Sequence, residues 1–245
     1  MDRGLNSKGN EMESVLFYGV PHGCSFGSIV ALEWLGQPYR LHRIDMLSKR
    51  SDSFATVSPL GQTPAMITKD GKPLTESLAI LHSIAARGLD KGLGFAQGTK
   101  KFDELNWMLS YLHTTLHSAL GYGWNAYKLD EDDHAGKAFL RRLAREKSAE
   151  AYAYLQGVLE GREWLVGDTK TVADAYFIGI ARWGEDLGLF DIAREFPGIH
   201  KHMARLEADP AVIFAHAIED ETPHTSSGGF RGQLTVQELD TRLAA

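Results

Sequence analysis

The sequence predicts a small α/β domain followed by an all-α domain. Strand-like runs of β-branched and aromatic residues occur in its early part, and amphipathic helical stretches fill most of the remainder. A glycine-rich segment separates the two parts. We therefore divide the chain into a flexible tail (1–14), an α/β domain (15–87), a linker (88–99), an all-helical domain (100–219) and a C-terminal extension (220–245).

The composition is that of a globular protein with an ordinary core, since 43% of the 245 residues are hydrophobic and 24% are charged. The net charge of −6 disfavours nucleic acid and anionic membrane surfaces as partners. No apolar run approaches the ~18 residues of a membrane-spanning helix. The first 14 residues lack the apolar core of a secretory signal, and the single cysteine, Cys24, cannot form an internal disulfide, so a cytoplasmic location is expected.

The first domain opens with a βαβ unit. Residues 15–18 form a β-branched and aromatic run, residues 25–35 carry apolar side chains at helical spacing, and residues 39–45 alternate as a strand does. Two strands joined by a helix over this length should be parallel.

A short helix at 52–57 is followed by a β run at 64–68, a hairpin turn at Asp70-Gly71 and a second strand at 72–74. Thr75 is the expected N-cap of the next helix. The element order, βαβ, a small helix and then ββα, is that of a thioredoxin-like domain. Beyond the linker, helices are expected over 100–120, 134–160, 171–187, 198–208 and 210–219, with a last helical turn near 236–243.

Cys24 and Ser25 lie where the first strand passes into the first helix. Unpaired N–H groups and the positive dipole end at this position stabilise a thiolate or another anion. Either side chain could present a sulfur or donate a hydrogen bond to a bound one. The alternative is a buried, inert cysteine.

Two other junctions suit an extended peptide. A cis Thr63–Pro64 bond would turn the Thr63 backbone outward to pair with such a ligand, although most X-Pro bonds are trans. Glu76 and Ser77 open the third helix, where the N–H groups and the hydroxyl suit a carboxylate and Glu76 suits an ammonium. Both residue types are also common helix caps.

Several features of the helical part are read as structural. Thr171 and Asp174 fit a capping arrangement, so Asp174 is expected to serve the fold. His113 and His117 are spaced as metal ligands on a helix, but no further ligand is evident, so they are expected as surface or substrate-pocket histidines and no metal is expected. The His-Lys-His run at 200–202 is expected on a solvated face, and Tyr122, Trp124 and Tyr127 could line an apolar pocket.

In combination these segments resemble the glutathione transferases. Pro21-x-x-Cys24-Ser25, the SPLGQTPA run at 58–65 and Thr75-Glu76-Ser77 follow one another as in the family's glutathione-binding domain. A cysteine at the start of the first helix is similar to the bacterial beta class. The resemblance continues through 105–113 and 164–183, and it spans roughly 15–219.

The resemblance implies a bacterial detoxification enzyme, a homodimer that conjugates the thiolate of its co-substrate glutathione to a small hydrophobic electrophile. It implies that Glu76 and Ser77 hold the γ-glutamyl end and that the Thr63 backbone, beside a cis Pro64, pairs with the cysteinyl unit. It further implies that Cys24, Asn106 and His113 lie near the glutathione sulfur. The chain departs from relatives at His22, Tyr111, Thr114 and Lys170, where other residue types are usual.

Two alternatives stay open beside conjugation: thiol–disulfide exchange through Cys24, and a non-catalytic binding protein. Two adjacent thiolates repel each other, so Cys24 and glutathione cannot both be ionised. Conjugation therefore requires a neutral Cys24 that donates a hydrogen bond, with Ser25 as the other possible donor.

Overall fold

A computed structural model describes residues 13–243, so most of the expected N-terminal tail lies outside the described residues. The elements of the first part are β1 (Ser14–Val20), α1 (Phe26–Leu35), β2 (Tyr39–Asp45), α2 (Asp52–Val57), β3 (Ala65–Ile67), β4 (Pro73–Thr75) and α3 (Ser77–Arg87). They follow the predicted thioredoxin-like order.

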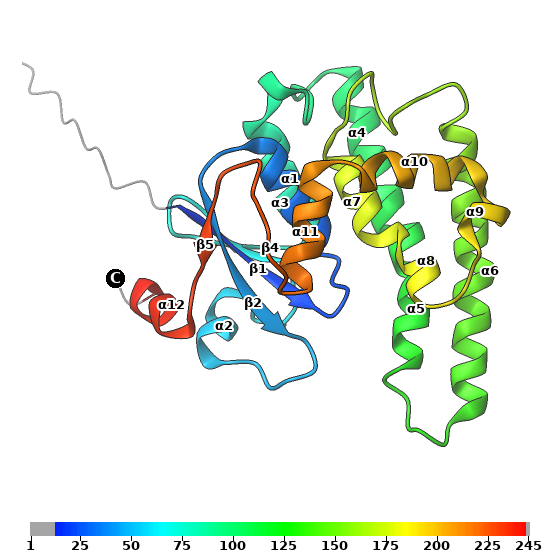
Figure 1. Cartoon of the computed structure of the whole chain (residues 1–245), viewed down its shortest axis with the longest axis horizontal. Helices are drawn as coiled ribbons and strands as arrows, with labels where there is room; N and C mark the ends of the chain where they lie inside the picture. Colours follow the sequence, from blue (N-terminus) through cyan, green and yellow to red (C-terminus); the bar gives the residue numbers. More distant parts are fainter. Residues whose placement is uncertain (1–12, 244–245) are drawn as a thin grey trace, which may run out of the picture.

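The second part is helical until the C-terminal extension (Figure 1). Its elements are η1 (Leu89–Lys91), α4 (Lys100–Tyr111), the π-helical η2 (Leu112–His117), α5 (Ser118–Ala126), α6 (His134–Val158), α7 (Val172–Ala181), α8 (Trp183–Asp186), α9 (Ile192–Glu195), α10 (Pro197–Glu207), α11 (Pro210–Glu219), β5 (Phe230–Gln233) and α12 (Val236–Leu243).

The five strands form one sheet in the order β4-β3-β1-β2-β5. β1 and β2 are parallel, as the βαβ pattern predicts, and β3 and β4 form the antiparallel hairpin around Asp70-Gly71. Side chains of β1 alternate between two cores because successive residues of a strand face opposite sides. Leu16 and Tyr18 join the large core with α1 and the helical domain, whereas Val15 and Phe17 join a smaller core on the other face.

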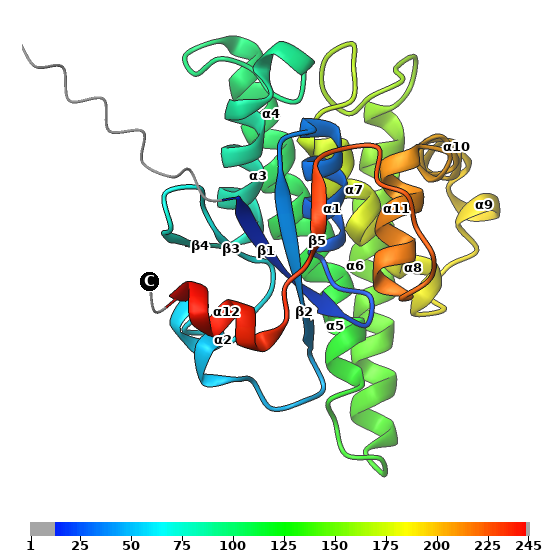
Figure 2. The ribbon, with the colours of Figure 1, turned by 60° about the vertical axis from the view of Figure 1, so that its left-hand side comes forward.

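Helix α1 connects the two parts of the molecule. It packs against α7 and α11 of the helical part as well as against α3, and its residues belong to the large core. Figure 2 shows α1 between the sheet and helices α7 and α11. The two domains therefore share one continuous core, and the turn that precedes α1 lies at their junction.

The long helix after the linker extends further than the sequence predicts. The expected end near residue 120 is wrong, because α4, η2 and α5 follow without interruption to Ala126. A helix expected over 171–187 is instead broken at Arg182 into α7 and α8.

The predicted cap of α7 is confirmed. Asp174 is fully buried and accepts hydrogen bonds from the Thr171 backbone N–H at 2.9 Å and from the Leu165 N–H at 3.0 Å. The same carboxylate lies 3.1 Å from Nε2 of His202, which is 2% exposed. His200 and Lys201 are exposed as expected, but the solvated position expected for His202 is wrong. The N-cap of α3 also differs from the expectation, since it is Glu76 and not Thr75.

The C-terminal extension contains a strand that the sequence does not predict. β5 pairs in parallel with β2 and covers what would otherwise be the edge of the sheet. The buried carboxylate of Glu33 anchors the approach to this strand by accepting bonds from the Ser226 hydroxyl at 2.8 Å and the Gly228 N–H at 2.8 Å. A Cβ on Gly229 would lie 1.9 Å from the Gln37 carbonyl oxygen, so only glycine permits this close approach.

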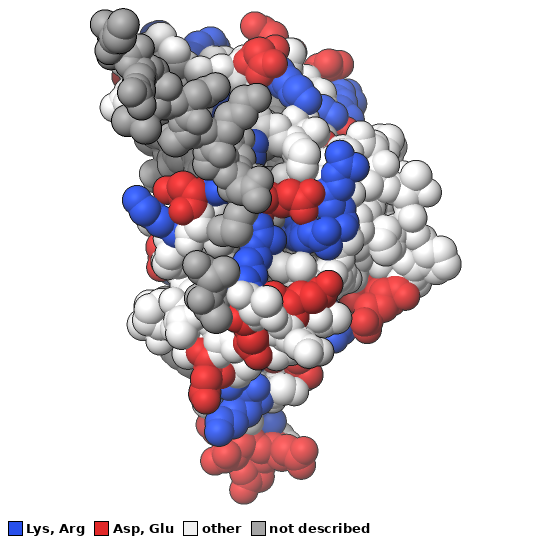
Figure 3. Space-filling model, turned by 90° about the vertical axis from the view of Figure 1, so that its left-hand side faces the viewer, with Lys and Arg blue, Asp and Glu red and all other residues white. Residues whose placement is uncertain are grey.

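Helix α12 follows β5 and lies beside α2 (Figure 2). Its Leu239 is fully buried in the smaller core with Phe54 and Val57 of α2. Acidic and basic side chains are interspersed over the face of the molecule that Figure 3 shows. Within the described residues, no helix combines the length and apolar character needed to cross a membrane.

Candidate active site

One cleft gathers segments from both domains. It receives residues from the β1–α1 turn, the loop before β3, the start of α3 and the π-helical η2. Its lining residues are Cys24, Ser58, Pro59, Leu60, Gln62, Thr63, Pro64, Thr75, Glu76, Ser77, His113 and His117.

Cys24 is partly buried at this cleft, and its thiol is held by polar neighbours. Sγ lies 3.5 Å from the Thr63 carbonyl oxygen and 3.9 Å from Oγ of Ser77. Burial raises the pKa of the Cys24 thiol to about 11, and this effect exceeds the opposing influence of the Ser77 hydrogen bond. The thiol is therefore neutral near pH 7 and donates to Thr63, so its place before a helix does not make it a thiolate.

The peptide-binding junctions expected from the sequence lie at the same cleft. The Thr63–Pro64 bond is cis, as predicted, and Thr63 directs its carbonyl toward Cys24. Glu76 is exposed and has φ 72°, an uncommon conformation for a residue with a side chain. Ser77 is the first residue of α3 and is 5% exposed.

Two histidines on η2 share one tyrosine. The hydroxyl of Tyr176, a fully buried residue of α7, lies 2.9 Å from Nδ1 of His113 and 2.6 Å from Nδ1 of His117. Burial lowers the pKa of His117 to about 4, and the neighbouring His113 adds to this effect. Burial also raises the pKa of Tyr176 well above 10, so this phenol stays protonated. In residues 13–243 no group of three or more His, Cys, Asp or Glu side chains could hold a metal ion.

Aromatic side chains lie beside the histidines and the Cys24 turn. Trp183 contacts His117 at 5.0 Å between ring centroids, and Trp124 packs against Trp183, Tyr127 and His22. Tyr127 is 64% exposed, so this group reaches the surface. Trp124 and Tyr127 thus pack together beside His22 and Trp183, and the apolar pocket expected for Tyr122, Trp124 and Tyr127 stays a prediction.

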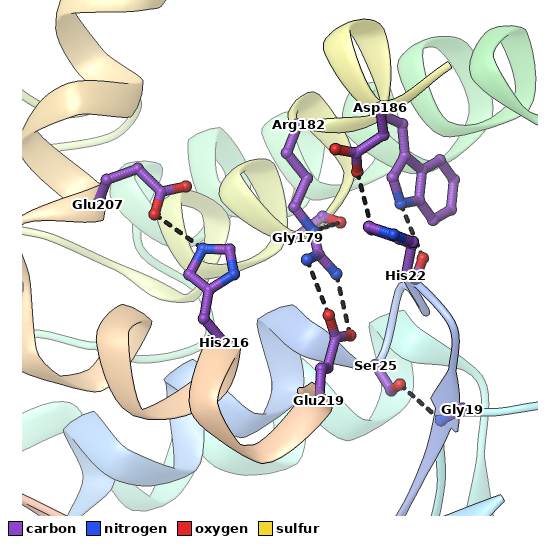
Figure 4. Close-up of polar contacts among 10 residues, drawn as sticks. Gly19, His22, Ser25, Gly179, Arg182, Asp186, Glu207, His216 and Glu219 are labelled. Carbon is purple, nitrogen blue, oxygen red and sulfur yellow. Dashed lines mark hydrogen bonds and ion pairs between the residues drawn. The ribbon is translucent and has the colours of Figure 1, made fainter. Parts of the chain in front are cut away.

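The turn that carries Cys24 is fixed by contacts with the helical domain (Figure 4). Trp183 Nε1 donates to the His22 carbonyl at 2.9 Å, and His22 Nδ1 lies 3.1 Å from the Asp186 carboxylate. The buried Arg182–Glu219 ion pair, 2.8 Å long, places its guanidinium 4.0 Å above the ring of Phe26 at the start of α1. These contacts fix the position of the Cys24 turn relative to the helical domain that contains η2.

The structure does not place Ser25 at the cleft. Its hydroxyl is fully buried and accepts the Gly19 N–H at 3.0 Å (Figure 4). Because the next residue in a turn points in a different direction, Ser25 fastens the end of β1 while Cys24 faces the cleft. The expectation that Ser25 could replace Cys24 as a donor is therefore wrong.

Asn106 also lies away from the cleft. It borders a separate hollow between α3 and α4 together with His82 and Phe102. About 10 Å of helix separates Asn106 from His113, and the two residues line different hollows. The expectation that Asn106 faces the same sulfur as His113 is corrected.

The sequence indicated neither Tyr176 as the partner of His117 nor a place for Gln62 at the cleft. The four-residue spacing of His113 and His117 did indicate a shared helix face, and the structure fills the place between them with a tyrosine hydroxyl in place of a metal. Gln62 lines the cleft and belongs to the SPLGQTPA run, in which the sequence indicated a role for Thr63 and Pro64 only.

Comparison with known proteins identifies the family. Residues 24–87 match the model for the glutathione S-transferase N-terminal domain, and residues 116–210 match the model for the C-terminal domain. A glutathione S-transferase of Xanthomonas campestris is 32% identical over 177 residues, which cover 70% of this chain and 83% of the relative. The chain belongs to the glutathione S-transferase family.

Solved structures agree with this assignment. A sphingomonad glutathione S-transferase complexed with glutathione is 27% identical, with a TM-score of 0.74 over 84% of this chain and 98% of its own. A beta class transferase of Sphingomonas chungbukensis is 26% identical, with the same TM-score and coverage. This transferase therefore resembles the bacterial beta class in fold as well as in motifs.

Proposed function

We propose that this transferase binds glutathione in the cleft at Cys24 and conjugates its thiolate to small hydrophobic electrophiles. One observation carries the proposal: Cys24, Thr63, Ser77 and His113, from four separate segments, line a single cleft together with Glu76. The donor at Ser77 and the carboxylate of Glu76 are complementary to the γ-glutamyl zwitterion. The Thr63 backbone is available to the cysteinyl unit.

The chemical task of the site is to supply glutathione as a thiolate, since the thiol is mostly protonated near neutral pH. His113 and His117 are the imidazoles that line the cleft, and the lowered pKa of His117 makes it a weak base, so we assign the acceptance of this proton to His113. Cys24 is neutral, so it adds no second negative charge, and its S–H, which donates to the Thr63 carbonyl in this structure, would turn to donate to the bound sulfur. The same high pKa argues against thiol–disulfide exchange, which needs the thiolate of Cys24.

The electrophile would lie against the aromatic group beside the cleft. His117 and Trp183 adjoin the sulfur side, and Trp124 and Tyr127 continue toward the surface. Flat apolar side chains of this kind favour aromatic or aliphatic substrates with little polar surface.

Binding to immobilised glutathione, followed by assays with an aryl halide and with a glutathione mixed disulfide, tests this function. We expect retention on the resin and conjugation of the halide. Disulfide reduction that is lost in Cys24→Ala would instead support exchange, and failure to bind glutathione would support a non-catalytic role.

We also propose a homodimer. Trp107 of α4 and Tyr154 of α6 are 49% and 46% exposed and pack with Tyr111 into one aromatic surface group. Exposed aromatic groups of this kind favour a protein interface. Trp107→Glu should yield monomers in light scattering, whereas Phe139→Glu, near the other end of α6, should not.

A single cysteine and the need for reduced glutathione suit a cytoplasmic location.

A further inference from the structure

The Tyr176 hydroxyl carries one proton but has two imidazole partners. Nδ1 of His113 and Nδ1 of His117 lie within hydrogen-bond distance of it, and the Ser77 hydroxyl is a third polar neighbour whose hydrogen bond opposes the rise in the pKa of Tyr176. A hydroxyl has one proton and two acceptor lone pairs, so it can donate to at most one of these nitrogens and must accept from at least one. At least one of the two histidines therefore carries its proton on Nδ1.

The distances assign the direction of these bonds. Hydroxyl donors make shorter hydrogen bonds than N–H donors. The 2.6 Å contact is therefore the Tyr176 O–H donating to His117, and the 2.9 Å contact is the His113 Nδ1–H donating to Tyr176. His113 then has its lone pair on Nε2, and His117 has its proton on Nε2.

The local helix geometry and packing keep this arrangement in place. The π-helical turn Leu112–His117 brings the two rings to 5.4 Å between centroids. π-helical turns are rare and frequent at functional sites. Trp183 packs edge-on against His117, and Tyr176 is fully buried, so neither partner is free to rotate away.

We propose that Tyr176 and His117 are positioning residues that fix His113 as the Nδ1–H tautomer and so leave its Nε2 lone pair to take the thiol proton of glutathione. The S–H bond breaks, the proton moves to Nε2 of His113, and the electron pair stays on sulfur. The resulting imidazolium keeps its Nδ1–H bond to Tyr176. This inference rests on the proposed function for its catalytic consequence, but the tautomer itself does not depend on glutathione.

The ¹⁵N spectrum of the histidine rings in the full-length, ligand-free protein tests the tautomer directly, because protonated and bare ring nitrogens differ widely in chemical shift. We expect a protonated Nδ1 at His113 in the unmodified protein and a protonated Nε2 in Tyr176→Phe. In His117→Ala the freed Tyr176 hydroxyl should turn to His113 and produce the same change. His117→Asn supplies an oxygen acceptor near the Nδ1 position and should retain the original tautomer.

Tyr152→Phe is the matched control, because Tyr152 is also fully buried and its hydroxyl donates to the Ala181 carbonyl, away from the cleft. We expect Tyr176→Phe to lower kcat/KM for an aryl halide roughly 10-fold with little change in glutathione KM, and Tyr152→Phe to leave both unchanged. A protonated Nε2 at His113 in the unmodified protein, or no change in Tyr176→Phe, would overturn the proposal. If the spectra are as predicted but the protein conjugates no substrate, the proposed function is contradicted and the tautomer assignment is not.

Discussion

The sulfur of Cys24 lies 3.5 Å from the carbonyl oxygen of Thr63, although the two residues are 39 positions apart in the chain. The contact joins the β1–α1 turn to the loop before β3, and it requires a thiol that carries its proton. Burial supplies that condition by raising the pKa of Cys24 to about 11. The cysteine is therefore a hydrogen-bond donor at the cleft and a poor nucleophile.

The alkylation rate of Cys24 should reflect this pKa. We expect the rate with iodoacetamide to rise about 10-fold per pH unit between pH 7 and pH 9 without levelling off, because the thiolate fraction stays small. In the unfolded protein, which has the same single cysteine, the alkylation rate should level off near pH 9. A plateau below pH 8 in the folded protein would show an activated thiolate.

Removal of the Cys24 thiol should have a limited effect on conjugation. Cys24→Ala loses one donor to the bound sulfur, so we expect the conjugation rate to fall by roughly 10-fold and no glutathione adduct to form. Mass spectrometry under oxidising conditions and an aryl halide assay check the two statements. Complete loss of conjugation in a folded variant would give Cys24 a larger role than the structure supports.

Asp174→Ala should destabilise the fold. The substitution leaves the Thr171 and Leu165 N–H groups and His202 without their buried acceptor, so we expect the free energy of unfolding to fall by about 3–5 kcal/mol. Urea denaturation measures the change, with the exposed Asp168→Ala as control. Glutathione affinity of the folded fraction should be unchanged, and a fully stable variant that has lost catalysis would reverse this assignment.

The C-terminal helix should support the cleft through α2. Leu239 is fully buried against α2, and residues 58–62, which border the cleft, follow directly after that helix. Leu239→Ala should lower the free energy of unfolding by about 2–4 kcal/mol and raise the KM for glutathione. Val236→Ala, in the same helix but 52% exposed, is the control. Equal stability of the two variants would show that α12 does not hold α2.

Stability should depend on pH through His117. Its pKa is about 4 in the folded protein and about 6.5 when unfolded, so the unfolded chain binds a proton that the folded chain excludes. The free energy of unfolding should therefore fall as the pH drops from about 7 to about 5, by at most about 2 kcal/mol from this group. The fall should be smaller in His117→Asn and unchanged in His134→Asn, where the histidine is exposed. The same dependence in all three proteins would refute a buried neutral His117.

Sequence patterns predicted the parts of this structure that depend on local signals. The βαβ unit, the hairpin at Asp70-Gly71 and the cap formed by Thr171 and Asp174 all follow from neighbouring residues. β5 was missed because its segment is polar and rich in glycine, and it becomes a strand only by pairing with the distant β2.

The same limit applied at the site. Cys24 and Ser25 are adjacent and chemically similar. Only the conformation of the turn determines that Cys24 faces the cleft and that Ser25 accepts the Gly19 N–H. The hydrogen-bond partner of His117 is a tyrosine 59 positions away, which no spacing rule identifies. The burial of His202 likewise depends on Asp174, which lies on another helix.

Calorimetric titration of glutathione into four proteins tests the central claim, that glutathione lies in the cleft with its γ-glutamyl end at the start of α3. Glu76→Gln should weaken binding by about 1–2 kcal/mol, because a charge-assisted hydrogen bond to the ammonium becomes a neutral one, and Ser77→Ala by about 1 kcal/mol, because one hydrogen bond is lost. Asn106→Ala, beside the separate hollow between α3 and α4, should bind as the unmodified protein does. Unchanged affinity in Glu76→Gln and Ser77→Ala, or a loss confined to Asn106→Ala, would place glutathione elsewhere and contradict the account.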